Sequence, residues 1–124
     1  MTKTGNSKPV YDSEERSACW RIAKRIRLYV KKLPKSIANI EDSKQVVKAY
    51  GSVGANYIEA NESFSDKDFK YRIKISRKES KESAYFLRLI YETNPPEFEE
   101  DGKVLYSEAI QLKKILSTIL NKST

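Results

Sequence analysis

The chain has 124 residues, which is enough for one domain with a modest hydrophobic core, and it carries a net charge of +7. It has no histidine and a single cysteine, Cys19, so catalytic sites built on histidine, ordinary zinc sites and an internal disulfide are excluded. The scarcity of cysteine and the shortness of the apolar runs favour a cytoplasmic protein with no membrane segment and no cofactor.

Residues 1–12 are expected to form a disordered lead, followed by a single domain over residues 13–122. The first helix is expected over residues 13–33, because a capping side chain and two acids precede apolar residues spaced three and four apart. These apolar residues are Cys19, Ile22, Ile26, Tyr29 and Leu33. Pro34 follows them and should end the helix.

Residues 35–42 are expected to connect the first two helices, with Ile37 and Ile40 packed under the bundle. The second helix should run from Asp42 or Ser43 to about residue 62. Two glycines inside it weaken an isolated helix by about 1 kcal/mol each relative to alanine. Three small residues on one side of this helix are therefore predicted to let another backbone approach closely: Gly51, Gly54 and Ala55.

The third helix is expected over residues 66–91, because apolar residues recur at helical spacing near both of its ends. Its middle, Ser76 to Ser83, holds no apolar residue at all. A helix that is packed at both ends should also be packed in the middle, so a polar partner within the fold or an external ligand should face this stretch.

The fourth helix should begin between Glu99 and Val104, after two prolines that end the third. No strand-like alternation competes with the four periodic segments. Short connections favour antiparallel neighbours, so the sequence predicts an all-α fold, an antiparallel up-down four-helix bundle.

Two phrases carry a family resemblance. The second helix reads Ser-Val-Gly-Ala-Asn-x-x-Glu-Ala from Ser52, and the third reads Lys-Glu-x-x-Glu from Lys78. The chain resembles the bacterial four-helix-bundle family first met in intervening sequences of large-subunit ribosomal RNA genes, which includes accessory variability determinant proteins of diversity-generating retroelements. Two positions depart from the family pattern: Phe86 stands where tryptophan is expected, and Gln111 where an acid is expected.

The resemblance implies a bundle that assembles as a ring, usually a homopentamer. For the retroelement branch it also implies a basic outer surface that binds RNA or DNA, and a reverse transcriptase as partner. Most members of the family have no established activity, and we expect none of the enzymatic kind here.

The basic residues of the first and third helices are the candidates for phosphate binding, because the positive charge is concentrated there. The alternative is that these residues form only a solvated face. The candidates are Arg21, Lys24, Arg25, Arg27, Lys31, Lys32, Lys35, Lys70, Lys74 and Lys78.

A second group of polar residues is expected to form an internal network if the second and third helices are antiparallel neighbours. Its members are Asn56, Glu59, Arg72, Ser76, Glu79 and Glu82. The alternative for the carboxylates is a magnesium site, but the interleaved lysine and arginine residues favour the network, and no metal is expected.

The aromatic residues at helical spacing are expected in the core or at a subunit interface, although they could instead stack on bases. They are Trp20, Tyr29, Tyr50, Tyr57, Phe69, Tyr85 and Phe86. The sequence thus favours a non-enzymatic nucleic-acid-binding accessory or assembly protein. The alternative is a scaffold that docks a partner such as a reverse transcriptase and has no affinity of its own for nucleic acid.

Overall fold

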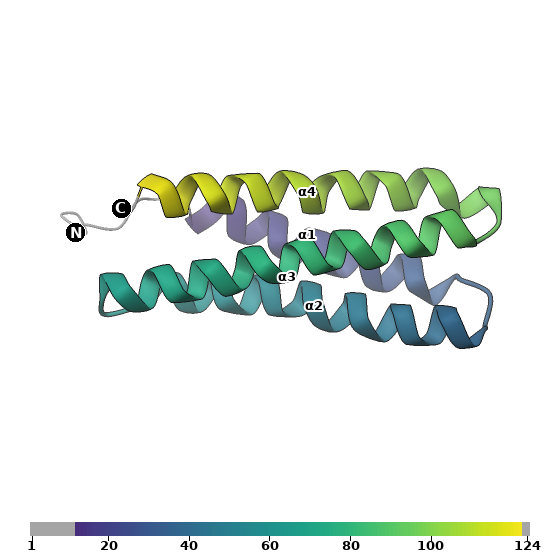
Figure 1. The fold of residues 1–124 in the computed structure, drawn as a ribbon, viewed down its shortest axis with the longest axis horizontal. Coiled ribbons are helices and arrows are strands. Elements are labelled where there is room, and N and C mark those ends of the chain that lie inside the picture. Colours follow the sequence, from purple (N-terminus) through teal and green to yellow (C-terminus); the bar gives the residue numbers. More distant parts are fainter. Residues whose placement is uncertain (1–11, 123–124) are drawn as a thin grey trace.

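The computed structural model describes residues 12–122, with side chains from residue 17 onwards. Its elements are α1 (Asp12–Lys31), α2 (Ile37–Asn61), α3 (Asp66–Thr93), the short 3₁₀ helix η1 (Pro96–Phe98) and α4 (Glu99–Lys122). Successive α-helices run in opposite directions, which confirms the predicted all-α up-down bundle (Figure 1). Most of the predicted disordered lead lies outside the described residues. Within those residues, no helix has the length and apolar character that a membrane crossing requires.

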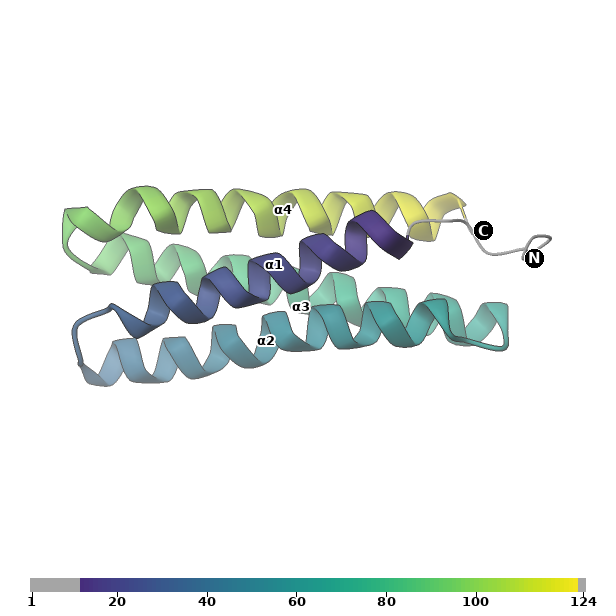
Figure 2. The same ribbon diagram turned by 180° about the vertical axis from the view of Figure 1, so that it is seen from behind.

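The four helices pack around one core, with α1 and α3 placed diagonally across the bundle. α3 packs against both α2 and α4, and α1 also contacts α2 and α4. Figure 1 shows α3 in front and α1 behind, and Figure 2 shows the reverse from the other side. Any surface formed by the outer face of α1 is therefore separated from the outer face of α3 by the width of the bundle.

The apolar stripe predicted for the first helix is buried along its whole length. Its five members are at most 8% exposed, and they join the residues of the other helices in one core cluster. Cys19 is one of these buried residues, at 2% exposure. The spacing of three and four residues thus places the core-facing side of α1 correctly.

The start of α2 differs from the prediction. The helix begins at Ile37 because Ser36 caps it, its hydroxyl accepting a hydrogen bond from the backbone N–H of Asn39 at 3.1 Å. The amide of Asn39 in turn donates to the Pro34 carbonyl at 2.7 Å and to Asn94 Oδ1 at 2.8 Å. The expectation that Ile37 and Ile40 pack under the bundle is wrong, since they are 85% and 47% exposed.

Three buried serines explain the polar middle of α3. Ser76 donates a hydrogen bond to the Val53 carbonyl of α2 at 2.8 Å, and Ser80 lies 3.4 Å from the Ala109 carbonyl of α4. Ser83 donates to the Glu79 carbonyl within α3 itself, at 2.8 Å. All three are fully buried, so the polar partner lies within the fold. Their small side chains let α3 pack against both neighbours at this level of the bundle.

The beginning of α4 packs tightly against α1 and α3. Tyr29 of α1 donates its hydroxyl to the Phe98 carbonyl at 2.9 Å, and the two rings meet edge to face with centroids 6.4 Å apart. Burial and the nearby Asp101 carboxylate raise the pKa of Tyr29 to about 12, so the hydroxyl remains a donor at neutral pH. Gly102 is buried beside it, where a Cβ atom would collide with Tyr91 Cβ and with the Tyr29 hydroxyl.

Candidate nucleic-acid interface

The cations predicted on the first helix have two different environments. Arg25 is half-buried and forms an ion pair with Glu108 of α4, with Nη1 2.8 Å from Oε1. This pair joins α1 to α4 and neutralises the charge of Arg25. Arg25 is therefore a structural contact in this chain, and it is the weakest of the predicted phosphate ligands on α1.

The remaining predicted cations of this region are exposed to solvent: Arg21, Lys24, Arg27, Lys31, Lys32 and Lys35. Within the part of the chain that the structure describes, none of the six has a carboxylate within ion-pair distance. Arg27 donates instead to the Ala23 carbonyl one turn earlier, at 3.1 Å. Arg21, Lys24 and Lys31 recur at helical spacing, so they share one outer face of α1. This face combines high positive charge with free access from solvent.

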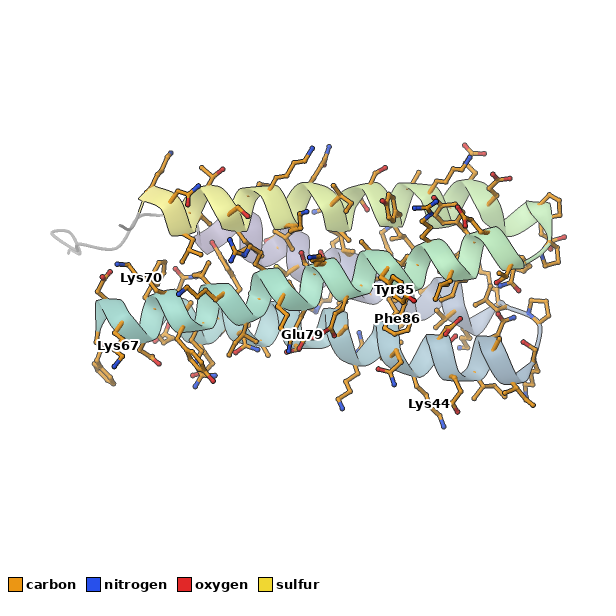
Figure 3. All side chains as sticks on the ribbon, in the orientation of Figure 1. Lys44, Lys67, Lys70, Glu79, Tyr85 and Phe86 are labelled. Carbon is orange, nitrogen blue, oxygen red and sulfur yellow. The ribbon has the colours of Figure 1, made fainter. Side chains whose placement is uncertain are left out.

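The predicted cations of the third helix lie on the other side of the bundle. Lys70 pairs with Asp66 at 3.0 Å, and its side chain is only 28% exposed. Lys74 and Lys78 are exposed. Figure 3 shows Lys67 and Lys70 on α3, near the turn that joins it to α2. Because α3 is diagonal to α1, these residues do not extend the α1 surface within one chain.

A groove of about 930 Å³ lies between α1 and α2, next to the cations of α1. Its lining includes Trp20, Lys24 and Arg27 from α1, and Gly51, Gly54, Ala55 and Ile58 from α2. Trp20 is 67% exposed, and the Lys24 Nζ atom lies 5.1 Å from the centroid of its ring. The groove was not predicted, because sequence reasoning assigned Trp20 to a core or an interface. The sequence feature that could have indicated an exposed Trp20 is its position outside the three- and four-residue spacing of the buried stripe.

The small residues of α2 line this groove and are not pressed against another backbone. A Cβ atom at Gly51 would lie 3.6 Å from Arg27 Nη2, and one at Gly54 would lie 3.5 Å from Cys19 Cβ. Both distances are ordinary van der Waals contacts, and Ala55 is exposed. Gly54 therefore packs in contact with Cys19 of α1, while the close-packing role of the three small residues as a set stays a prediction.

The seven predicted aromatic residues divide into three groups, and one of them, Phe86, is partly buried and packs against the core. Tyr29, Tyr50, Tyr57 and Phe69 are buried in the core. Trp20 and Tyr85 are not, at 67% and 62% exposure, so a core position is wrong for both. For these two side chains, a subunit interface or base stacking stays the prediction.

The six residues of the predicted polar network do not form one network, but divide into a first group of Arg72 and Asn56, a second of Glu79 and Glu82, and the separate residues Ser76 and Glu59. Arg72 donates to Asn56 Oδ1 at 3.2 Å, and Asn56 Nδ2 donates to the Ser52 carbonyl and hydroxyl, both at 3.0 Å. Glu59 is exposed. The antiparallel register, in which Val53 faces Ser76, puts Glu59 opposite the start of α3. In this register Glu59 faces Lys70, and at 1.5 Å of rise per residue that level is about 14 Å along the axis from Glu79.

Glu79 and Glu82 form the second group, beside Lys48 of α2. A small pocket of about 180 Å³ separates them from Gln45 and Ser52. Figure 3 shows Glu79 on the side of α3 that faces α2. Burial and the neighbouring Glu82 raise the pKa of the Glu79 carboxyl above its usual value. Over the described residues, no group of three or more acidic, cysteine or histidine side chains is arranged to hold a metal ion.

Comparisons with known proteins give one family and one informative structure. The model of the 23S rRNA-intervening sequence protein family matches residues 15–118 of the chain. A crystal structure from Bacteroides thetaiotaomicron, a protein of unknown function from the S23 ribosomal protein family, has 28% sequence identity and a TM-score of 0.71. The match covers 85% of this chain and 96% of that chain. No curated protein matches the sequence significantly.

Proposed function

This chain belongs to the family of 23S rRNA-intervening sequence proteins, and we propose that it is a non-enzymatic nucleic-acid-binding accessory protein whose binding surface is the outer face of α1. The matching family and the similar solved structure are both of unknown function. The proposal therefore depends on the chemistry of the surface.

The observation that carries the proposal is the set of exposed cations on and just after α1 that have no carboxylate partner within residues 17–122: Arg21, Lys24, Arg27, Lys31, Lys32 and Lys35. A cation already paired with a carboxylate gains little from a phosphate, whereas an unpaired one releases condensed counterions when it binds the backbone. Contacts of this kind position a nucleic acid without reading its sequence. We therefore expect binding that depends on charge and salt and only weakly on sequence.

Assembly of identical subunits would strengthen such binding. We propose that the chain forms a homo-oligomeric ring, with five as the number that the family resemblance implies. Each subunit of the ring would add one α1 surface, and linked weak sites bind a polyanion more tightly than a single site does.

A second candidate function is a docking scaffold, for a reverse transcriptase or another protein. It is favoured by exposed aliphatic side chains near the Arg25–Glu108 ion pair. By helical spacing, Leu28 lies one turn after Arg25, and Val104 lies one turn before Glu108. Ile115 lies two turns after Glu108 on the same side, and all three aliphatic residues are exposed. A partner protein with an apolar ridge would bury this strip.

Lysine footprinting tests where the nucleic acid binds. The protein is acetylated with and without a saturating structured RNA, and each modified lysine is quantified by mass spectrometry. We expect Lys24 and Lys31 to be protected, because phosphates would cover their ammonium groups. Lys74 and Lys78 on α3 are exposed internal controls and should react equally in both samples. Protection confined to the lysines of α3 would contradict the assignment to α1. If every lysine reacts equally with and without RNA, the result would favour the docking scaffold.

A further inference from the structure

We propose that the groove between α1 and α2 binds an unpaired base of a single-stranded nucleic acid, which stacks on Trp20 while its flanking phosphates contact Lys24 and Arg27. This inference rests on the proposed function and adds a ligand class to it. It distinguishes a single strand, whose bases are free to leave their neighbours, from a duplex, whose bases are already stacked and paired.

The shape of the groove suits a flat ring. Gly51, Gly54 and Ala55 give α2 a low floor at this level, and Ile58 adds an apolar wall. Trp20 projects from α1 beside this floor and keeps 67% of its surface exposed. The volume of about 930 Å³ is within the range of small-molecule sites, so the groove has enough space for a base and its sugar.

The cations at the groove select the class of ligand. Lys24 lies over the Trp20 ring, with its ammonium 5.1 Å from the ring centroid. The Arg27 guanidinium reaches across to α2, where Nη2 lies 3.6 Å from the position of a Cβ atom at Gly51. Neither cation has a carboxylate partner among the described residues. The groove therefore offers an apolar face and two positive charges within one small space.

A nucleotide complements both the apolar face and the positive charges of the groove. Its base has a flat face that stacks on an aromatic side chain, and its phosphate is a fixed negative charge close to that face. A partner surface without acidic side chains would have to cover Lys24 and Arg27. Burying charged groups without opposite charges is unfavourable, so the charge pattern favours the nucleotide.

The sequence contains a single tryptophan, so tryptophan fluorescence reports on this groove alone. The protein is titrated with oligouridylate, with a matched strand of abasic residues, and with a duplex. In parallel, end-labelled versions of the three ligands are followed by fluorescence anisotropy. We expect all three to bind, but only oligouridylate should quench the Trp20 emission to saturation, because only its bases are free to stack.

Substitution gives a second readout. Trp20→Leu should weaken oligouridylate binding roughly tenfold and leave duplex binding unchanged, since stacking on an aromatic side chain adds about that much to affinity. Tyr85→Leu is the matched control, because Tyr85 is similarly exposed but lies on α3. This substitution should change neither the affinity for oligouridylate nor the affinity for the duplex. Far-UV circular dichroism verifies that both variants remain helical.

The outcomes separate the two proposals. Anisotropy that rises without quenching, together with unchanged binding by Trp20→Leu, would overturn the base-binding groove and leave the α1 surface standing. No rise in anisotropy for any ligand would overturn both. An emission spectrum that shifts to the blue as the concentration of protein alone increases would show that a second copy covers the groove, which also overturns the inference.

Discussion

Gly102→Ala is expected to destabilise the bundle by about 2 kcal/mol, because the added methyl group enters a space that is already full. A Cβ atom there would collide with Tyr91 Cβ, which is fixed by the backbone of α3, and with the Tyr29 hydroxyl. That hydroxyl is held by its 2.9 Å hydrogen bond to the Phe98 carbonyl, so relief of the clash would break a buried contact. Alanine also favours a helix over glycine by about 1 kcal/mol, which offsets only part of the cost.

Urea unfolding followed by circular dichroism measures this effect, and two other glycines are the controls. Gly51→Ala and Gly54→Ala place the new methyl group at ordinary contact distances, 3.6 Å from Arg27 Nη2 and 3.5 Å from Cys19 Cβ. These two variants should be as stable as the unchanged protein, or more stable by up to about 1 kcal/mol. A Gly102→Ala protein as stable as the two controls would show that α4 does not pack against α1 and α3 as described.

Reversing three charges on α1 is expected to abolish most nucleic-acid binding. The variant Arg21→Glu, Lys24→Glu, Lys31→Glu lowers the net charge from +7 to +1 and places carboxylates on the proposed surface. Each lost phosphate contact on a duplex should reduce the slope of log K against log salt by about 0.9, and the affinity at low salt should fall by well over tenfold. Arg25 is left unchanged because it pairs with Glu108, and a glutamate there would face that carboxylate.

A variant with the same change in net charge on the opposite face is the control. Lys67→Glu, Lys74→Glu, Lys81→Glu alters three exposed lysines of α3 and also gives a net charge of +1. Anisotropy with a labelled duplex should show binding close to that of the unchanged protein, apart from a small general loss from the lower net charge. Equal losses in the two variants would mean that total charge, and not the α1 surface, determines binding.

The helices and their buried sides could be predicted from the sequence, because both depend on spacing within one segment. The stripe from Cys19 to Leu33 is buried throughout, and the conflict in the middle of α3 correctly indicated a polar partner for Ser76 and Ser80. A serine hydroxyl bonded to a neighbouring helix carbonyl needs only a small residue at a core position. Such a pattern can be recognised from the sequence alone.

The start of α2 is set by the Ser36 cap, a local signal that the sequence prediction did not use, and a contact between distant residues reinforces it. Asn39 is held by Asn94, which lies 55 residues away in the chain, through reciprocal amide hydrogen bonds of 2.8 and 2.9 Å. Ser36 caps the helix through the backbone N–H of the same Asn39, and Ile37 in the first turn is exposed. Sequence reasoning instead treated the isoleucines as core residues, and so began the helix too late.

The candidate site depended on how the helices are arranged around the bundle. Lys24 and Lys74 both belong to basic helical faces, but the diagonal placement of α1 and α3 separates them. The register of α2 against α3 likewise separates Glu59 from Glu79. The groove beside Trp20 arises from the packing of α1 on α2, which no single segment specifies.

The measurement that tests the central claim most directly is the salt dependence of binding by the unchanged protein. Fluorescence anisotropy of a labelled duplex is recorded over a series of salt concentrations, from low to above physiological. If about four of the exposed cations on α1 engage phosphates, log K should fall linearly with log salt, with a slope of roughly −3 to −4. No binding at the lowest salt, or an affinity that salt does not change, would contradict the claim that this surface binds nucleic acid.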